Sequence, residues 1–527
     1  MATGDFTELL RFDPRNYVIV SYMNLPQWLA ELDAFFDPPR YKIRLGSRDL
    51  FDLWPFSLSF RRFNSHIYLV GSSGQGKSYY LLYLLFQLAT KGFGCGVFDP
   101  HSDLASDFIA QLASYPKQKP WLGHAENRRK IIYIDPSRSD YIVPCNILKN
   151  SYCTPHETAE NVVEAFRRVW PDALSEAPRF AQIMRNGVLV LIANGLSLLE
   201  LEPLLTDRVF RRRLLTQVKD PLVVSFFENQ YDRWGREQAI FVSPVLNKVT
   251  AFLFKPQVRL MLGAEENRLD FRQIIDSGSI LVLNLGCFRD EQTQRLLGSL
   301  FLTSLEQAAF SRSDIPSSQR RPFFAMIDEF PLFCSRDATS LARILSECRK
   351  YRLHLGLSHQ TITQLPGERI QGALENARLK IIFGTGRQTA QSIVADLFMP
   401  DPKAVKHEVK DAQAQERTHP LFNPLNDQFE IFTQTIQRLK RRRILVKLPD
   451  KERVYKVRVP SVPAPRISGA QLERIKQALS KELGKPSVAL EQEIVIRAKR
   501  YMVPYYQVNS DSQSASMQSK ADEEVFQ

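Results

Sequence analysis

Short apolar runs alternate with helix-like segments from residue 64 onward. Runs of Val, Ile, Leu and Phe of about four to eight residues, bounded by polar or turn residues, are typical of strands buried on both faces of a parallel sheet. Because strands that alternate with helices form parallel crossover units, the pattern predicts an α/β fold with a mainly parallel sheet. The predicted strands are residues 66–70, 95–99, 130–135, 279–286, 323–328, 353–357 and 379–383.

A long helical stretch interrupts this alternation. Residues 151–270 have helical periodicity and almost no strand pattern, so we expect an all-helical subdomain inserted into the α/β core. One helix start is clear, because Thr154 and Glu157 form a capping box with proline at the first helical position. Further helices are expected after Ser175, Thr206 and Asp220.

The outer segments complete the predicted organisation. A small leader of strands and turns is expected at residues 1–62, followed by a core formed by 63–150 and 271–460. Near the end of that core, two strands joined by a turn at Asp450 and Lys451 are predicted to lie at the sheet edge. The rest of the chain is expected to be a helical extension at 461–508 and a disordered tail at 509–527, which is rich in Ser, Gln and Asp.

One glycine-rich loop carries the strongest chemical signal. Gly71 is followed after four residues by Gly76, Lys77 and Ser78, with a buried strand before the loop and an apolar helix after it. Backbone N–H groups of such a loop surround phosphate oxygens, the lysine reaches the β- and γ-phosphates, and the serine hydroxyl can ligate Mg²⁺. The residues predicted to bind ATP are Gly71, Ser72, Ser73, Gly74, Gln75, Gly76, Lys77, Ser78 and Tyr79.

A second acidic site follows the apolar run at 323–327. Asp328 and Glu329 at the end of a buried strand form a Walker B element, in which Asp328 would hold Mg²⁺ beside Ser78. Glu329 would then polarise the attacking water as general base. Alone, the two carboxylates would suit a helix N-cap equally well. Beside a complete phosphate-binding loop, the catalytic interpretation is favoured.

Two polar residues near the next strand are further candidates. Gln360 follows the strand at 353–357 and can sense the γ-phosphate, although surface glutamines are common. Arg349 ends the preceding helix and could reach a neighbouring subunit's ATP as an arginine finger. A solvated basic helix terminus also explains Arg349, and the residue chemistry alone favours that explanation.

Composition sets the remaining bounds. The chain has 527 residues and a net charge of +13, which suits a polyanionic partner without requiring one. Its six cysteines form no C-x-x-C pair, so buried thiols in a reducing compartment are expected rather than disulfides or zinc. Neither a signal peptide nor a sufficiently apolar span is visible, so we expect a cytoplasmic protein that does not insert directly into a membrane.

The ordered motifs resemble one family. GSSGQGKS, VFDPHSDL, IDEF, ECRKYRLHLGLSHQTITQL and ENARLKIIFGTGRQTAQSIVADLF are similar to segments of the HerA–FtsK superfamily of DNA-pumping ATPases, most of all TraG/TraD-type conjugative coupling proteins. The resemblance spans roughly residues 64–460 and implies a RecA-like core in a ring, usually a hexamer, with DNA in a central channel. Unlike the membrane-anchored coupling proteins, this chain shows no transmembrane helices before its phosphate-binding loop.

The resemblance also implies residue roles. Lys77, Glu329, Gln360 and Arg349 would be catalytic, with Arg349 acting as the arginine finger. Asp99 would lie close to the nucleotide, and Arg387 is a second candidate for an intersubunit contact.

Three functions stay open at this stage. The first is an ATP-driven DNA translocase. The sequence indicates neither whether its DNA is single- or double-stranded nor whether a secretion channel, a relaxase or a nuclease is its partner. The second is an ATPase that energises protein export, and the third is an ATP-gated scaffold for DNA-processing partners.

Overall fold

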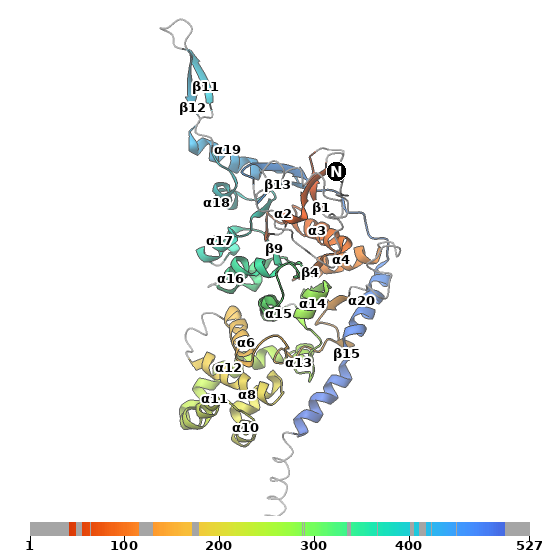
Figure 1. The fold of residues 1–527 in the computed structure, drawn as a ribbon, viewed down its shortest axis with the longest axis vertical. Helices are drawn as coiled ribbons and strands as arrows, with labels where there is room; N and C mark the ends of the chain where they lie inside the picture. The colour runs from red at the N-terminus through yellow and green to blue at the C-terminus, as the bar shows by residue number, and fades with distance from the viewer. Residues whose placement is uncertain are drawn as a thin grey trace, which may run out of the picture. The chain divides into compact units, whose positions relative to one another are not determined.

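The computed structural model divides into two compact units, residues 1–134 with 271–476 and residues 135–270 with 477–527 (Figure 1). We describe each unit by itself. The residues that the structure describes are 42–48, 55–63, 65–114, 130–170, 179–286, 288, 290–334, 339–365, 367–400, 405–410, 418–422, 424–449 and 451–500.

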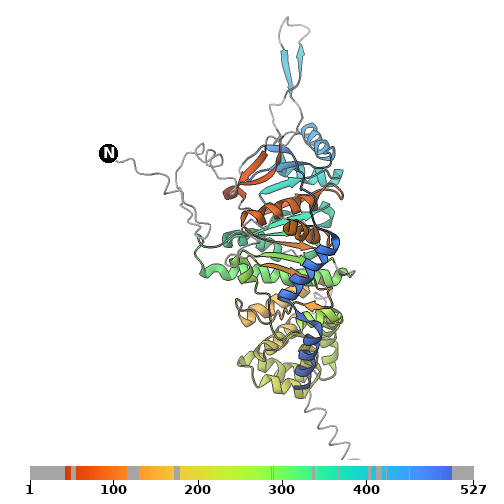
Figure 2. The same ribbon diagram turned by 90° about the vertical axis from the view of Figure 1, so that its right-hand side faces the viewer.

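A large sheet forms the first unit, and the described residues contribute eleven strands to it. Figure 2 shows these strands one beside another with helices packed against them. In spatial order the strands are β2 (Pro55–Ser59), β1 (Lys42–Ser47), β14 (Val454–Arg458), β13 (Arg443–Lys447), β10 (Leu379–Ile382), β3 (Ile67–Val70), β9 (Leu353–His359), β8 (Phe323–Ile327), β4 (Gly94–Asp99), β7 (Ile280–Asn284) and β5 (Ile131–Ile134).

From β10 to β5, each strand runs parallel to the next one in this order, whereas β10 is antiparallel to β13 on its other side. Every residue of β3, β4, β7, β8 and β9 is buried, as expected for strands covered by helices on both faces. All the strands predicted from apolar runs are present, so the predicted α/β class with a mainly parallel, RecA-like sheet is confirmed.

The prediction for the last two strands was partly wrong. β13 and β14 pair as an antiparallel hairpin, as expected from the turn between them. They do not lie at the sheet edge, because β10 pairs with β13 and β1 pairs with β14. β1 and β2, from the segment expected to be a leader, extend the same sheet beyond β14. Hydrogen-bonding partners distant in sequence therefore decided which strand is the edge.

Helices and two further strands complete the first unit. The pair β11–β12 forms a separate antiparallel sheet in a region where the sequence suggested no element. The elements are α2 (Phe60–Phe63), α3 (Lys77–Lys91), α4 (Asp103–Ser114), α14 (Phe271–Ser277), α15 (Glu291–Ser311), η7 (Arg312–Asp314), η8 (Phe330–Phe333), α16 (Thr339–Glu347), η9 (Cys348–Tyr351), η10 (Ile362–Gln364), α17 (Glu368–Leu374), α18 (Arg387–Leu397), β11 (Val405–Lys410), β12 (Thr418–Phe422) and α19 (Leu425–Gln437).

The second unit is mostly helical. The predicted capping box is confirmed: Glu157 N donates to Thr154 Oγ1 at 3.2 Å, and Thr154 N donates to the Glu157 carboxylate at 2.8 Å. Asp220 caps the helix that follows it. The elements are β6 (Tyr141–Ile142), α6 (Pro155–Val169), α8 (Arg179–Ala193), η3 (Leu198–Glu200), α9 (Leu201–Thr206), α10 (Arg208–Leu215), α11 (Pro221–Ser225), η4 (Phe226–Gln230), η5 (Tyr231–Arg233), η6 (Gly235–Glu237), α12 (Gln238–Leu253), α13 (Pro256–Leu262) and β15 (Lys485–Pro486).

The C-terminal part contains the predicted helix α20 (Gly469–Leu483) and a further helix at 487–500. Within the second unit, β15 pairs with β6. Arg497, only 8% exposed, donates to the Glu200 carboxylate at 2.8 Å and to Gly263 O at 2.6 Å. This buried ion pair attaches the terminal helix to the helices of residues 135–270, which the sequence did not indicate.

Three histidines are fully buried in the sheet. Burial lowers the pKa of His66 and of His359 to about 4 and holds the pKa of His354 well below its usual value of 6.5. These rings are neutral in the folded protein but take up protons once unfolded. Between pH 6.5 and about 4 the unfolded state binds more protons, so the free energy of unfolding falls as the pH falls.

We expect each buried histidine to remove about 1.4 kcal/mol of stability per pH unit within that window. His354 tests this, because its ring stacks on Phe324 and neither ring nitrogen has a hydrogen-bond partner among the described residues. Thermal unfolding of a His354→Phe variant should lose less stability between pH 7 and pH 5.5 than the unchanged protein does. Equal losses for the unchanged protein and for His354→Phe would contradict the assignment.

Candidate phosphate-binding and hydrolysis site

The predicted site residues lie at one end of the parallel sheet. Because β3, β9, β8 and β4 are adjacent and parallel, the loops that follow them meet at the carboxyl ends of the strands. This is the usual ligand-binding position in parallel α/β sheets. β9 lies between β3 and β8, so Gln360 lies between the glycine-rich loop and the pair Asp328 and Glu329.

The glycine-rich loop connects β3 to α3. Gly74 and Gly76 adopt positive φ angles of 76° and 101°, a conformation that favours glycine. A Cβ on Gly71 would lie 2.4 Å from Phe383 Cβ, so only glycine fits there. No side chain caps the start of α3, which leaves its N-terminal N–H groups available for an anion.

Lys77 lies across this loop. Its side chain is largely buried, and Nζ donates to Ser72 O at 3.3 Å. Burial lowers the pKa of Lys77, while the carboxylates of Glu329 and Asp328 act in the opposite direction. The ammonium group therefore lies against the loop backbone that would surround phosphate, and the charges of the two carboxylates favour its protonated form.

Ser78 and Asp328 come together although 250 residues separate them in the sequence. Ser78 Oγ donates to Asp328 Oδ2 at 2.8 Å, and Asp328 is only 3% exposed. A hydroxyl and a carboxylate beside a phosphate-binding loop are the oxygen ligands that Mg²⁺ takes, directly or through water. The residues present therefore fit a magnesium ion.

Glu329 is held by amide groups. It occupies the left-handed region at φ 46°, which is uncommon for a non-glycine residue and typical of functional sites. Gln360 Nε2 donates to Glu329 Oε1 at 2.9 Å, and Gln364 Nε2 lies 3.5 Å from Oε2. Both carboxylate oxygens are thus oriented, which suits a group that has to position a water molecule.

A buried pair behind Gln360 was not foreseen. Tyr68 OH lies 2.7 Å from His359 Nε2, and His359 Nδ1 lies 3.0 Å from Thr361 O. Since a carbonyl only accepts, Nδ1 carries the proton and the tyrosine hydroxyl donates to Nε2. The pair connects β3 to the turn that carries Gln360. In the sequence, the signal for this pair was that Tyr68 and His359 each place a polar group in an otherwise apolar run.

Asp99 has a local partner for each oxygen. It is fully buried, Oδ1 accepts from His101 N, Oδ2 accepts from Ala105 N, and both distances are 2.8 Å. Burial raises the pKa of Asp99, against the effect of these bonds. The carboxylate therefore holds the start of α4. Its contact with a nucleotide stays a prediction.

Tyr79, which follows Ser78, contacts a segment near the C-terminal end of the first unit. Its hydroxyl contacts the backbone of Val462, and the guanidinium of Arg442 lies 4.8 Å from its ring centroid.

Arg387, the second candidate for an intersubunit contact, makes a two-bond ion pair with Glu430 of the same chain at 2.8 and 2.9 Å.

Arg349 lies at the opposite end of the sheet. It precedes β9, whereas Gln360 follows that strand, and a seven-residue strand spans about 20 Å. Arg349 is exposed, and no ion pair of its guanidinium occurs within the described part of the chain. It therefore cannot reach a nucleotide on the glycine-rich loop of its own chain.

Residues 46–305 match the family model described as the central domain of the helicase HerA. No curated protein sequence matches the chain significantly. Among the described residues, no helix combines the length and apolar character needed to cross a membrane.

Solved structures with a similar fold include a coupling protein. The unbound bacterial conjugative coupling protein TrwB superposes with a TM-score of 0.55 at 17% identity, covering 83% of this chain and 93% of that one. TrwB with a non-hydrolysable GTP analogue gives 0.56 at 16% identity, covering 83% and 94%. TrwB with ADP and Mg²⁺ gives 0.53 at 18% identity, covering 78% and 88%.

Proposed function

We propose that this chain, a P-loop protein of the HerA–FtsK type that resembles conjugative coupling proteins, is an ATPase. Its hydrolysis of ATP drives the movement of DNA. The observation that carries the proposal is the convergence of Lys77, Ser78, Asp328, Glu329 and Gln360 at one end of the sheet. That a similar fold has been solved with ADP and Mg²⁺ supports the choice of ligands.

Each side chain has a separate task in this proposal. The N–H groups of the loop and the Lys77 ammonium bind the phosphates, and the Ser78 and Asp328 oxygens hold Mg²⁺. Bound Mg²⁺ would neutralise charge on the β- and γ-phosphate oxygens. Glu329 accepts the proton of the attacking water. Gln360 keeps the Glu329 carboxylate oriented and, through that contact, registers whether the γ-phosphate is present.

The assembly we propose is a ring of copies of this chain. Its motivation is the position of Arg349, which lies about 20 Å along β9 from the pocket of its own chain. If this exposed arginine contacts a nucleotide, that nucleotide is bound to a neighbouring copy. Such a finger stabilises the charge that develops on the transferring phosphoryl group.

The rate of ATP hydrolysis distinguishes DNA from protein as the cargo. The net charge of +13 and the likeness to conjugative coupling proteins favour DNA. We expect ATP turnover to rise when single-stranded or duplex DNA is added, and the comparison of the two identifies the preferred strand. A rate that neither DNA raises would favour the second candidate, an ATPase acting on protein cargo.

Salt gives an independent test. A protein that neutralises about six phosphates of duplex DNA loses about a thousandfold in affinity between 50 and 200 mM salt, because released counterions drive binding. We expect a loss of this order for the ATP-bound protein, measured by fluorescence anisotropy of a labelled duplex. Affinity independent of salt, or no binding at all, would contradict DNA as the cargo.

A further inference from the structure

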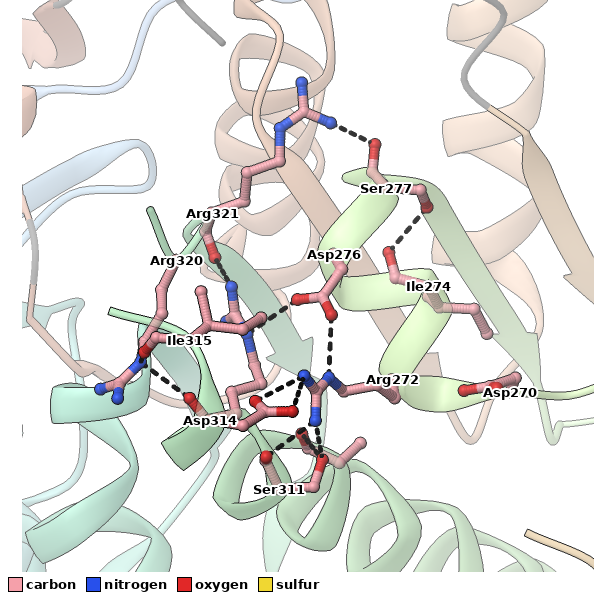
Figure 3. A network of polar contacts seen from close by, with 12 residues as sticks. Asp270, Arg272, Ile274, Asp276, Ser277, Ser311, Asp314, Ile315, Arg320 and Arg321 are labelled. Atoms are coloured by element: carbon pink, nitrogen blue, oxygen red, sulfur yellow. Dashed lines mark hydrogen bonds and ion pairs between the residues drawn. The ribbon is translucent and has the colours of Figure 1, made fainter. Parts of the chain in front are cut away.

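A polar network that includes Arg272, Asp276 and Arg320 (Figure 3) contacts the segment that carries Arg349. At its centre is Arg312, whose side chain is fully buried. Its guanidinium donates to Tyr351 O at 2.7 Å and to Arg321 O at 2.8 Å, and Nε lies 2.9 Å from Asp276 Oδ1. Arg312 thus joins the segment that enters β9 to the segment that enters β8.

Arg320 makes a second connection to the same segment. Its Nη1 donates to Lys350 O at 2.8 Å, and its guanidinium lies 5.0 Å from the ring centroid of Tyr351. Nε donates to Arg312 O at 3.0 Å and to Ile315 O at 2.8 Å. The two arginines therefore contact consecutive carbonyl groups, those of Lys350 and Tyr351.

These carbonyls belong to the end of a helical stretch. The last C=O groups of a helix have no intrahelical partner, and cationic donors suit them electrostatically. Burial lowers the pKa of Arg312 to about 10, with Asp276 acting in the opposite direction, so Arg312 remains a cation at neutral pH. Cys348, on the other side of Arg349, is fully buried. The backbone is thus held on both sides of Arg349 while its side chain is exposed.

We propose that Arg312 and Arg320 are positioning residues that hold Cys348–Tyr351 so that Arg349 projects toward the ATP of a second copy of the chain. The inference rests on the proposed function, in which Arg349 acts across a subunit interface. Neither arginine touches the nucleotide in this account. Both act through η9, by hydrogen bonds to its carbonyl groups and, for Arg320, by its contact with the Tyr351 ring.

The competing explanation is that the network only stabilises the connection between α15 and β8. Arg272 provides a matched control, because it belongs to the same network and is bonded equally well. It donates to Asp276 at 2.9 Å, to Ser311 O at 2.7 Å and to Asp314 at 2.7 Å. No hydrogen bond of Arg272 to η9 occurs among the described residues. Loss of either arginine weakens the network, but only the loss of Arg320 frees the Lys350 carbonyl.

The experiment compares Arg320→Ala with Arg272→Ala in the full chain. A displacement of about 1 Å of a catalytic group can cost a hundredfold in rate, so we expect kcat to fall about tenfold to a hundredfold in Arg320→Ala. Its KM for ATP should change little, and Arg272→Ala should retain the kcat of the unchanged protein. Arg320→Lys keeps the positive charge but lacks the forked donor of the guanidinium, so its kcat should lie between those of Arg320→Ala and Arg272→Ala.

Mixed assemblies separate positioning from general stability. An Arg320→Ala copy has an intact pocket and a displaced finger, whereas a Lys77→Ala copy has a damaged pocket and an intact finger. Mixing them should restore part of the activity. The inference is overturned if the mixture stays inactive although mixed assemblies form. It is also overturned if Arg320→Ala and Arg320→Lys hydrolyse ATP as fast as the unchanged protein while Arg349→Ala is inactive. Normal turnover by Arg349→Ala would instead refute the finger role itself, and with it this inference.

Discussion

Replacement of Glu329 by glutamine is expected to slow ATP turnover about a hundredfold or more, while ATP still binds. A positioned base contributes about 10²–10⁴-fold to a rate, and glutamine cannot accept the proton of the attacking water. The amide oxygen of the new residue can still accept from Gln360 Nε2, which donates to Glu329 Oε1 at 2.9 Å. The substitution therefore removes the base without removing the contact that orients it.

Steady-state hydrolysis and binding of a fluorescent ATP analogue measure the two effects separately. The ATP-bound assembly should accumulate in Glu329→Gln because its hydrolysis is blocked. The exposed Glu375→Gln provides a control of the same chemistry away from the site and should hydrolyse ATP normally. Turnover by Glu329→Gln close to that of the control would mean that another carboxylate is the base.

Arg349→Ala should leave ATP binding nearly intact and reduce hydrolysis about 10³- to 10⁵-fold, the contribution known for arginine fingers. The reason is its position: Arg349 lies before β9, about 20 Å from the end of that strand where the pocket of its own chain is formed. A residue that cannot touch its own nucleotide should not affect binding there. It can contribute only when a neighbour's phosphoryl group develops charge.

Complementation tests this directly. A Lys77→Ala copy lacks the loop cation but keeps Arg349, whereas an Arg349→Ala copy keeps the pocket and lacks the finger. Some interfaces in a mixture combine an intact finger with an intact pocket, so part of the activity should return. If mixed rings form and remain as inactive as either variant alone, Arg349 does not act in trans. It would then be the solvated helix terminus that residue chemistry alone favoured.

Features that depend on nearby residues were determined by the sequence. The strands of the parallel sheet were predictable because buried strands require unbroken apolar runs. The glycine-rich loop was equally evident, since the spacing of Gly71, Gly76 and Lys77 defines a backbone that closes on itself within eight residues. The capping box at Thr154 is also a contact between residues three apart.

Only the tertiary structure decided which of these elements became neighbours. The apolar runs of β13 and β14 predict two strands but do not predict which strands pair with them. Their place inside the sheet depended on pairing with β10 and β1. The order β3, β9, β8 placed Gln360 against Glu329 and put Tyr68 against His359. It also placed Arg349 at the far end from its own pocket. Such contacts join residues tens to hundreds of positions apart, and their free energy depends on packing that no local pattern encodes.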